Sequence, residues 1–229
     1  MQVRFLGHAS FELAEGSTRV LIDPFLKPDN PTAVVGPDEV EPTHILLTHG
    51  HGDHATHAVE IAKRTGAKCV AIVELARWLT EQGVEDVADP NLGGTVELDW
   101  GWVRLVPAFH TNTLPDGRAI GIAAGLVIWI GGTAVYHLGD TCLFSDLKLV
   151  AERTPINVAL VPIGGHYTMD QEDAVTAAEL LDADTVIPMH YDTFSPIAAD
   201  PERFKRDVEA SPRTSSEVVI LRPGETYDE

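Results

Sequence analysis

The sequence predicts a layered α/β protein with mixed sheets covered by helices. Short apolar runs alternate with helix-like stretches along the whole chain, which is typical of this fold class. Residues 170–183, DQEDAVTAAELLDA, have the periodicity of an amphipathic helix. A chain of 229 residues can bury a sizeable core, and we expect residues 1–229 to form a single domain.

The first half of the chain is expected to contain strands, two helices and a hairpin. Apolar runs predict strands at 3–7, 18–26, 43–49 and 67–73. Residues 55–66 predict a helix that stops at Gly66, and residues 74–83 predict another that ends near Gly83. Residues 95–110 have the alternation of a hairpin or meander.

The apolar segment 119–136 has to be tested against a membrane span. It is nearly free of polar side chains, and its length is borderline for a spanning helix, which needs roughly 20 residues. Gly131 and Gly132 lie within it between β-branched residues, and this is the signal of a two-residue hairpin. We therefore expect two buried strands here and no membrane helix.

The second half continues the alternation of helices and strands. Helices are expected at 144–154, 170–183 and 200–210, and strands at 157–166 with its loop, at 185–190 and at 216–225. Asp200 is expected to cap the last helix, because Pro201 is suited to the first helical position.

Composition limits the partners and the compartment. The formal net charge of −19 disfavours nucleic acid and anionic membranes as partners. It does not exclude an anionic small-molecule substrate, because bound divalent ions would reverse the sign locally. Cys69 and Cys142 are the only cysteines and the N-terminus has no secretory signal pattern, so we expect a cytoplasmic protein without a disulfide framework. Exposed strands could support a homo-oligomer.

Histidine and aspartate recur where apolar runs end. The stretch THGHGDHATH alone carries four histidines and an aspartate. Five runs share this form: HILLTHGH, VRLVPAFH, AVYHLGD, VALVPIGGH and TVIPMH. Ligands bind beyond strand ends in α/β sheets, so these polar residues are expected to meet at one place. The alternative for each histidine alone is a structural hydrogen bond.

These residue types are suited to a metal site. Imidazole and carboxylate bind zinc, and they also accept manganese, iron and nickel. One ion needs three or four protein ligands, and the sequence offers seven candidates: His49, His51, Asp53, His54, His110, Asp140 and His190. The number therefore predicts two ions roughly 3.5–4 Å apart, zinc first among the candidates, and Asp140 could bridge them.

The motif HGHGDH, with the later AFH, LGDT and PMHYDTF in order, resembles the metallo-β-lactamase superfamily. The resemblance covers most of the chain and implies a four-layer αββα sandwich with two mixed sheets. It implies that His49, His51 and His110 hold the first ion. It likewise implies that Asp53, His54 and His190 hold the second ion and that Asp140 bridges the two ions. GHAS and GGHYTM look similar to a branch of metal-dependent hydrolases that includes L-ascorbate-6-phosphate lactonase-like proteins.

Three residues are candidates for catalytic roles beside the metals. Metal-activated water would attack the substrate, and Asp53 could orient it or shuttle a proton, or act only as a ligand. His8 and His166 follow apolar runs and could bind substrate, support a ligand or donate a proton; the alternatives are a structural hydrogen bond or an extra metal. Asp23 could fix the tautomer of a ligating histidine, or serve only a turn before Pro24.

The sequence thus favours a metal-dependent hydrolase of a small ester, lactone or similar compound. The first alternative is a phosphodiesterase acting on a small phosphorylated molecule or a lipid headgroup. A binding protein that retains metal without turnover is an alternative of another class. A di-iron redox protein is disfavoured, since the resemblance implies a carboxylate at the position of His51 and an attached flavin domain in such proteins.

Overall fold

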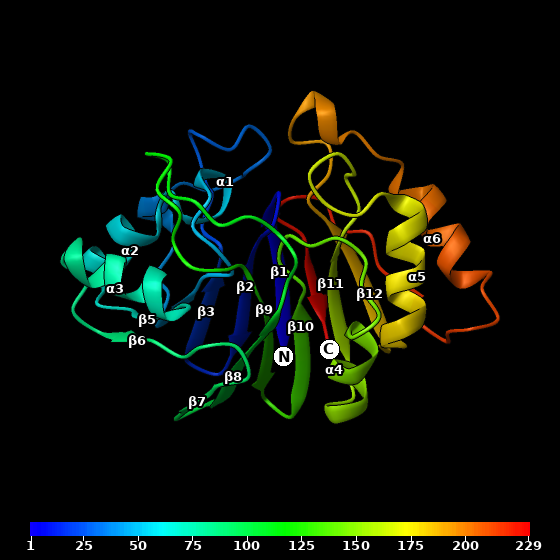
Figure 1. The fold of residues 1–229 in the computed structure, drawn as a ribbon, viewed down its shortest axis with the longest axis horizontal. Coiled ribbons are helices and arrows are strands. Elements are labelled where there is room, and N and C mark those ends of the chain that lie inside the picture. Colours follow the sequence, from blue (N-terminus) through cyan, green and yellow to red (C-terminus); the bar gives the residue numbers. More distant parts are fainter.

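Two mixed sheets of seven strands each pack face to face in the computed structural model, which describes residues 1–229 (Figure 1). In spatial order the first sheet contains β14 (Thr226–Asp228), β1 (Gln2–Gly7), β2 (Ser10–Glu15), β3 (Thr18–Ile22), β4 (His44–Leu46), β5 (Lys68–Val70) and β6 (Val87–Ala88). The second contains β13 (Glu217–Val218), β12 (Thr185–Met189), β11 (Val158–Pro162), β10 (Thr133–His137), β9 (Ala124–Ile130), β8 (Gly101–Pro107) and β7 (Thr95–Leu98).

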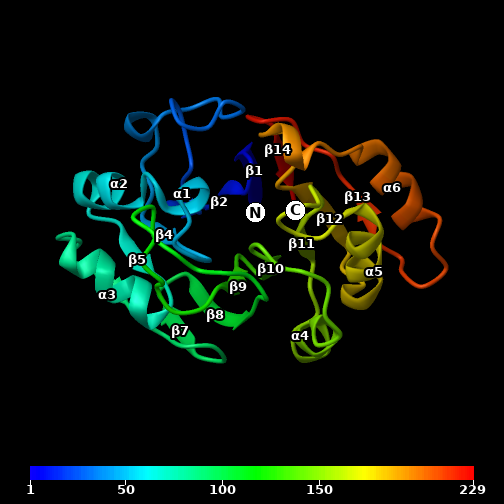
Figure 2. The same cartoon turned by 45° about the horizontal axis from the view of Figure 1, so that its top comes forward.

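Helices cover the outer faces of both sheets. They are α1 (Gly52–Ala55), α2 (Ala58–Thr65), α3 (Val73–Glu81), α4 (Leu147–Arg153), α5 (Gln171–Leu181) and α6 (Pro201–Glu209), with short 3-10 turns at Pro37–Glu39 and Ser195–Ile197. Helices α2 and α3 pack on the first sheet, and α4, α5 and α6 on the second. Figure 2 shows these groups on opposite flanks of the two sheets. The expected four-layer αββα sandwich is confirmed.

Strand β11 shows how the sequence fills both interfaces of its sheet. Val158 and Leu160 belong to the core between the two sheets. Ala159 and Val161 point the other way, into the core beneath the helices. Successive side chains of a strand point to opposite faces, so a strand covered on both sides must be apolar throughout. This is why the run is continuous in the sequence.

The apolar segment 119–136 contains the predicted hairpin. Ile130 pairs with Thr133 across Gly131 and Gly132, whose φ values are 60° and 87°. Positive φ at both central residues is what a tight hairpin turn of this length requires. No helix of the protein combines the length and the apolar character needed to span a membrane.

Several predicted boundaries were wrong. The strand expected at 18–26 ends at Ile22, because Asp23 adopts a left-handed φ of 45°. The helix expected at 55–66 begins at Ala58, after the separate turn α1. The strand expected at 216–225 covers only Glu217–Val218. Beyond it the chain crosses to the first sheet, where the unpredicted strand β14 pairs with β1; β2 was also not predicted.

Candidate metal centre

The candidate ligands lie in loops and in the short helix α1 at one edge of the sandwich, the upper edge in Figure 1. Strands β1, β3, β4, β8, β10, β11 and β12 run in parallel directions within their sheets, so their carboxyl ends meet there. His8 follows β1, His49 and His51 follow β4, Asp53 and His54 belong to α1, His110 follows β8, Asp140 follows β10 and His190 follows β12. The polar residues that follow the apolar runs therefore meet at one edge, as the sequence predicted.

His49, His51 and His110 form a first cluster. One ring nitrogen of each lies within 4.8 Å of those of the other two, and His49 Nε2 is 3.0 Å from His51 Nδ1. His49 is buried, whereas His51 and His110 are partly accessible. The structure thus brings together the three residues expected to hold the first ion.

A second cluster lies beside the first and is larger than expected. It contains Asp53, His54 and His190, the three residues that the resemblance assigns to the second ion, and in addition His8. Ligand atoms of all four lie within 4.8 Å of one another. His8, expected in a supporting or proton-donating role, is therefore placed among candidate ligands.

Asp140 lies between the two clusters. Its Oδ2 is 3.4 Å from His110 Nε2 and 3.1 Å from His190 Nε2, and its Oδ1 is 3.3 Å from His54 Nε2. The residue is 2% exposed. A single carboxylate therefore contacts both groups, as a bridging ligand must.

The buried donor atoms of the second cluster fit a cation. His8 Nε2, His54 Nε2, His190 Nε2 and Asp140 Oδ1 are buried without a hydrogen-bond partner. His54 Nε2 and Asp140 Oδ1 are close, at 3.3 Å, but they are not aligned as donor and acceptor. An unsatisfied buried polar group costs about 1–3 kcal/mol, so this concentration at one point indicates atoms arranged around a shared ion.

Two hydrogen bonds orient the rings of His49 and His54 so that Nε2 of each faces Asp140. The Nδ1–H of His54 donates to Asp23 Oδ2 over 2.8 Å, and His49 Nδ1 lies 3.0 Å from Thr48 Oγ1. Thr48 in turn donates its backbone N–H and its hydroxyl to the Asp23 carboxylate. Since the proton of each ring is held on Nδ1, Nε2 is the ligand atom. The hydrogen bond predicted between Asp23 and a candidate ligand is present.

Burial sets the charge of the first cluster. It lowers the pKa of His49 well below the ordinary value, and the charge of His54 acts in the same direction. Burial also lowers the pKa of His51 and of His110. The three imidazoles are therefore neutral at pH 7, which is the form that binds metal.

In the second cluster, neighbouring charges affect the pKa values of His54 and Asp140 more than burial does. Burial lowers the pKa of His54, but Asp140 and Asp23 counteract this and raise it well above the ordinary value. Burial likewise raises the pKa of Asp140, but His190 and His54 hold it well below its usual range. Without metal the proton on His54 thus balances two buried carboxylates. A metal ion that binds His54 has to displace this proton.

Backbone strain is concentrated at this edge. His8, Asp23, His166 and His190 all adopt left-handed φ values, of 59°, 45°, 51° and 56°. Such values are uncommon outside glycine and cost free energy. Strained residues of this kind are typical of functional sites. Here His8, Asp23 and His190 directly follow strands that end at the candidate centre, and His166 lies four residues after the end of β11.

His166 is the predicted site residue that lies outside both clusters. Its side chain is exposed, and its ring packs edge-on against Tyr167 at 4.5 Å. Tyr167 lines a cavity of about 320 Å³ together with His51, Asp53, His110, Thr111 and Asp140. His166 is thus placed next to the wall of this cavity and not among the candidate ligands.

Several residues that support the centre were not predicted. Thr193 contacts His8 Nδ1 at 2.9 Å, and Asn112 accepts from the backbone N–H of Gly50 at 2.8 Å. Thr141 contacts both the Phe109 and the Met169 backbone. Single polar residues in loops carry no motif, so only the position of Thr141 directly after Asp140 could have drawn attention to it.

The remaining histidines have structural partners. His57 Nδ1 accepts from the backbone N–H of Leu26, His137 Nε2 contacts the Ala9 carbonyl, and His44 contacts the Trp100 indole. None belongs to either cluster, so these three histidines serve hydrogen bonding and packing.

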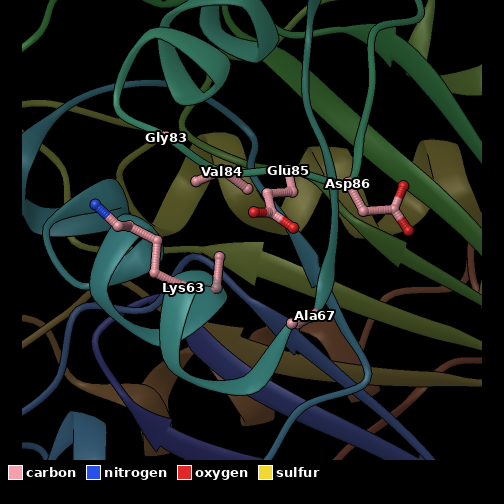
Figure 3. A pocket seen from close by; sticks show the side chains of 8 residues that line it. Lys63, Ala67, Gly83, Val84, Glu85 and Asp86 are labelled. Atoms are coloured by element: carbon pink, nitrogen blue, oxygen red, sulfur yellow. The ribbon is translucent and has the colours of Figure 1, made fainter.

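Another cavity, of about 280 Å³, lies between the end of α2 and the segment after α3 (Figure 3). Lys63, Glu85 and Asp86 are the charged residues that line it, and no histidine does so. The Lys63 amine donates to the Gln82 carbonyl, and Asp86 pairs with Lys68. None of these residues belongs to a group of candidate metal ligands.

Known proteins resemble the chain over its whole length. The family described as the β-lactamase superfamily domain matches residues 2–190. A UPF0173 metal-dependent hydrolase of Thermococcus onnurineus is 50% identical, covering 100% of this chain and 99% of the relative. One of Methanopyrus kandleri is 48% identical, covering 100% of both. The solved structure of Igni18, a metallo hydrolase of Ignicoccus hospitalis, is 37% identical with a TM-score of 0.89, covering 100% of this chain and 98% of that one. The chain therefore belongs to the β-lactamase superfamily, in its group of UPF0173 metal-dependent hydrolases.

Proposed function

We propose that the protein is a dinuclear metal-dependent hydrolase of small neutral substrates such as esters and lactones. The observation that carries this proposal is the position of Asp140 between two clusters of ligand atoms. Two sites that share one carboxylate are the arrangement of two-metal hydrolytic centres. Membership of a group of metal-dependent hydrolases supports the same activity.

The residues divide between the two ions as the clusters do. His49, His51 and His110 would hold the first, Asp53, His54 and His190 the second, with Asp140 shared. Bound divalent ions would supply an ionised water as nucleophile near neutral pH and would polarise the substrate. Histidine and carboxylate donors favour zinc and also accept manganese, iron and nickel.

Asp53 is suited to orient water and not to hold a proton. Burial raises the pKa of its carboxyl, but contact with His8 and the charge of His54 outweigh this and hold the pKa well below its usual range. The side chain keeps 32% exposure and lines the cavity. Asp53 therefore stays ionised at the cavity wall, where a carboxylate oxygen accepts hydrogen bonds from water.

The cavity favours a small neutral substrate over a phosphorylated one. Its volume of about 320 Å³ is near the lower end of ligand pockets, which span roughly 300–1,000 Å³. No lysine or arginine is among its lining residues, so the protein offers no side-chain cation for a phosphate. A neutral lactone or ester is thus favoured over the phosphorylated lactone that the lactonase-like branch implies.

Two exposed aromatic residues support an apolar substituent on this substrate. Tyr167 lines the cavity and is 55% exposed, and Phe109, next to His110, is 59% exposed. Their loops are held together, since the N–H of Phe109 donates to the Thr141 hydroxyl and the N–H of Met169 donates to the Thr141 carbonyl. We infer that Tyr167 and Phe109 contact the acyl or aryl group of the substrate. His166, packed against Tyr167, would contact the substrate from the same loop.

The test is turnover by metal-free and reloaded protein. The chelator-treated protein is reloaded with zinc or manganese and assayed on p-nitrophenyl butyrate, γ-butyrolactone and bis-p-nitrophenyl phosphate. We expect metal-dependent hydrolysis of the ester or lactone. Hydrolysis of the phosphodiester alone would establish the phosphodiesterase alternative. Tight metabolite binding without any hydrolysis would establish a metal-retaining binding protein.

A further inference from the structure

His8 is fixed in place by residues from both sheets. It follows β1 of the first sheet and is 1% exposed. Its Nδ1 lies 2.9 Å from the hydroxyl of Thr193, a residue 185 positions away in the chain. Its backbone carbonyl accepts from the N–H of His190, at 2.7 Å. The imidazole is thus held in one orientation, with Nε2 as its unengaged nitrogen.

That nitrogen points into the second cluster. His8 Nε2 is buried without a hydrogen-bond partner, although Asp53 Oδ2 is only 3.3 Å away. It lies within 4.8 Å of ligand atoms of Asp53, His54 and His190. Because the nearby carboxylate is not aligned to accept a proton from it, the ring is better placed for an ion that both residues share.

The backbone at this point indicates that the imidazole itself is needed. His8 and His190 both adopt left-handed φ, at 59° and 56°, which glycine or asparagine would adopt at lower cost. Their ring centroids are 4.0 Å apart, and the ring planes are tilted by 44°. Both strained positions thus aim imidazoles at the same point, which a purely structural turn does not require.

We propose that His8 Nε2 is a fourth protein donor to the second ion, beside Asp53, His54 and His190. This inference rests on the proposed dinuclear centre and deepens it. The second ion then has four ligands of its own and the first has three, and both ions share Asp140. Structural zinc sites are closed by protein ligands and catalytic ones keep an open position.

Burial agrees with this asymmetry. His8, His54 and His190 are at most 1% exposed, and none of them lines the cavity of about 320 Å³. His51 and His110, from the first cluster, do line it. The first ion would therefore present two accessible imidazoles to the substrate. The second would face this cavity only through Asp53 and the shared Asp140, and its four own ligands would hold it more tightly.

The variants for the test preserve the backbone conformation. His8→Gly accepts the left-handed φ and removes the imidazole. Thr193→Val keeps the imidazole and removes its hydroxyl partner. His44→Asn is the matched control, because His44 lies outside both clusters. A third cavity of about 340 Å³, lined in part by His8 and Tyr191, would give added imidazole access to the position left by His8→Gly.

Metal binding is measured by equilibrium dialysis against graded zinc, and coordination by the visible spectrum of the cobalt-loaded protein. We expect the wild type to bind two ions with unequal affinity. His8→Gly should weaken the tighter site roughly 10–100-fold, the range found when groups supporting a metal site are removed. It should also change the cobalt spectrum, and added imidazole should reverse both effects. Thr193→Val should weaken the site less, and His44→Asn should leave it unchanged.

A folded His8→Gly protein with unchanged affinities and cobalt spectrum would overturn the inference while leaving the dinuclear centre in place. Failure of the wild type to bind two ions would instead refute the proposed function. Ring-nitrogen NMR of the wild type with zinc needs no variant to fold. We expect the Nε2 resonance of His8 to shift as those of His54 and His190 do, and an unshifted resonance would exclude ligation.

Discussion

The backbone N–H of His190 donates to the carbonyl of His8 over 2.7 Å, which joins the end of β12 in one sheet to the end of β1 in the other. Each residue has a left-handed backbone and belongs to the second ligand cluster. The centre therefore forms only when the two sheets have packed against each other. Metal binding and assembly of the sandwich should accordingly stabilise each other.

Replacing Asp140 tests the shared carboxylate. Asp140→Asn keeps the side-chain volume but removes the charge between His110 and His190. We expect fewer than two bound ions and a loss of turnover of more than about 100-fold, because even partners one step removed from a metal are worth 10–100-fold. Metal analysis and ester hydrolysis measure both. Two bound ions with normal turnover would show that Asp140 is not a bridging ligand.

Replacing the buried residues His49 and His57 in turn distinguishes a metal ligand from a histidine with a structural role. His49→Ala should abolish turnover and lower metal content, because it removes a donor of the first cluster. His57→Ala should retain metal and activity. It should still destabilise the protein by about 1–3 kcal/mol, because it leaves the buried N–H of Leu26 without its acceptor. Urea unfolding with metal analysis distinguishes them, and metal loss in the His57 variant would contradict this division.

Asp23 should act on the metal through its hydrogen bond to His54 and, by way of Thr48, through His49. Asparagine can adopt the left-handed backbone of this position. The Asp23→Asn variant, however, weakens the hydrogen bond that Asp23 accepts from His54 Nδ1. We expect metal affinity to fall roughly 10–100-fold, the usual effect of such partners. Asp29→Asn is the control, since Asp29 approaches only His57. Equal affinities in the two variants would remove this supporting role from Asp23.

Esters with acyl chains of different length test whether Tyr167 contacts the substrate. Tyr167→Ala removes an exposed ring from the cavity wall. For p-nitrophenyl butyrate we expect a higher KM, with a loss in kcat/KM of about 10-fold, since burial of each CH₂ is worth about 0.8 kcal/mol. The loss should be smaller for p-nitrophenyl acetate. An equal loss for both esters would mean that Tyr167 does not contact the acyl chain.

Much of the candidate metal centre could be predicted because its signal is local. The loop HGHGDH contributes four candidate ligands within six residues, and apolar strands locate the positions of His110, Asp140 and His190. The alternation of strands and helices likewise predicted the layers. A strand buried on both faces, such as β11, is recognisable from its composition alone.

The role of His8 could not be predicted in this way. Its place in the second cluster depends on the packing of one sheet against the other and on Thr193, 185 residues away. His166 shows the converse, because it follows β11 in the same manner as the ligands yet its side chain is exposed. The end of a strand limits where a residue lies, but the local φ and the neighbouring loop decide where its side chain points.

Acidification should destabilise the metal-free protein between about pH 6.5 and pH 4. Burial lowers the pKa of His8 to about 4 and that of His49 well below 6.5, whereas both titrate near 6.5 when unfolded. The unfolded chain thus binds more protons in this range, and each such group lowers the free energy of unfolding by up to about 1.4 kcal/mol per pH unit.

His54 does not cancel this loss of stability. Its pKa is raised in the folded protein, so its stabilising contribution is complete below about 6.5 and declines only as the pH rises through the folded value. The low-pKa carboxylates Asp53 and Asp140 stay ionised throughout the range. Urea midpoints of chelator-treated protein at pH 7, 6 and 5 should therefore fall steadily. The fall should be shallower in His8→Asn, which lacks one of the buried imidazoles. A midpoint that holds or rises towards pH 5 would mean that these rings are already protonated in the folded state, a form that cannot bind metal.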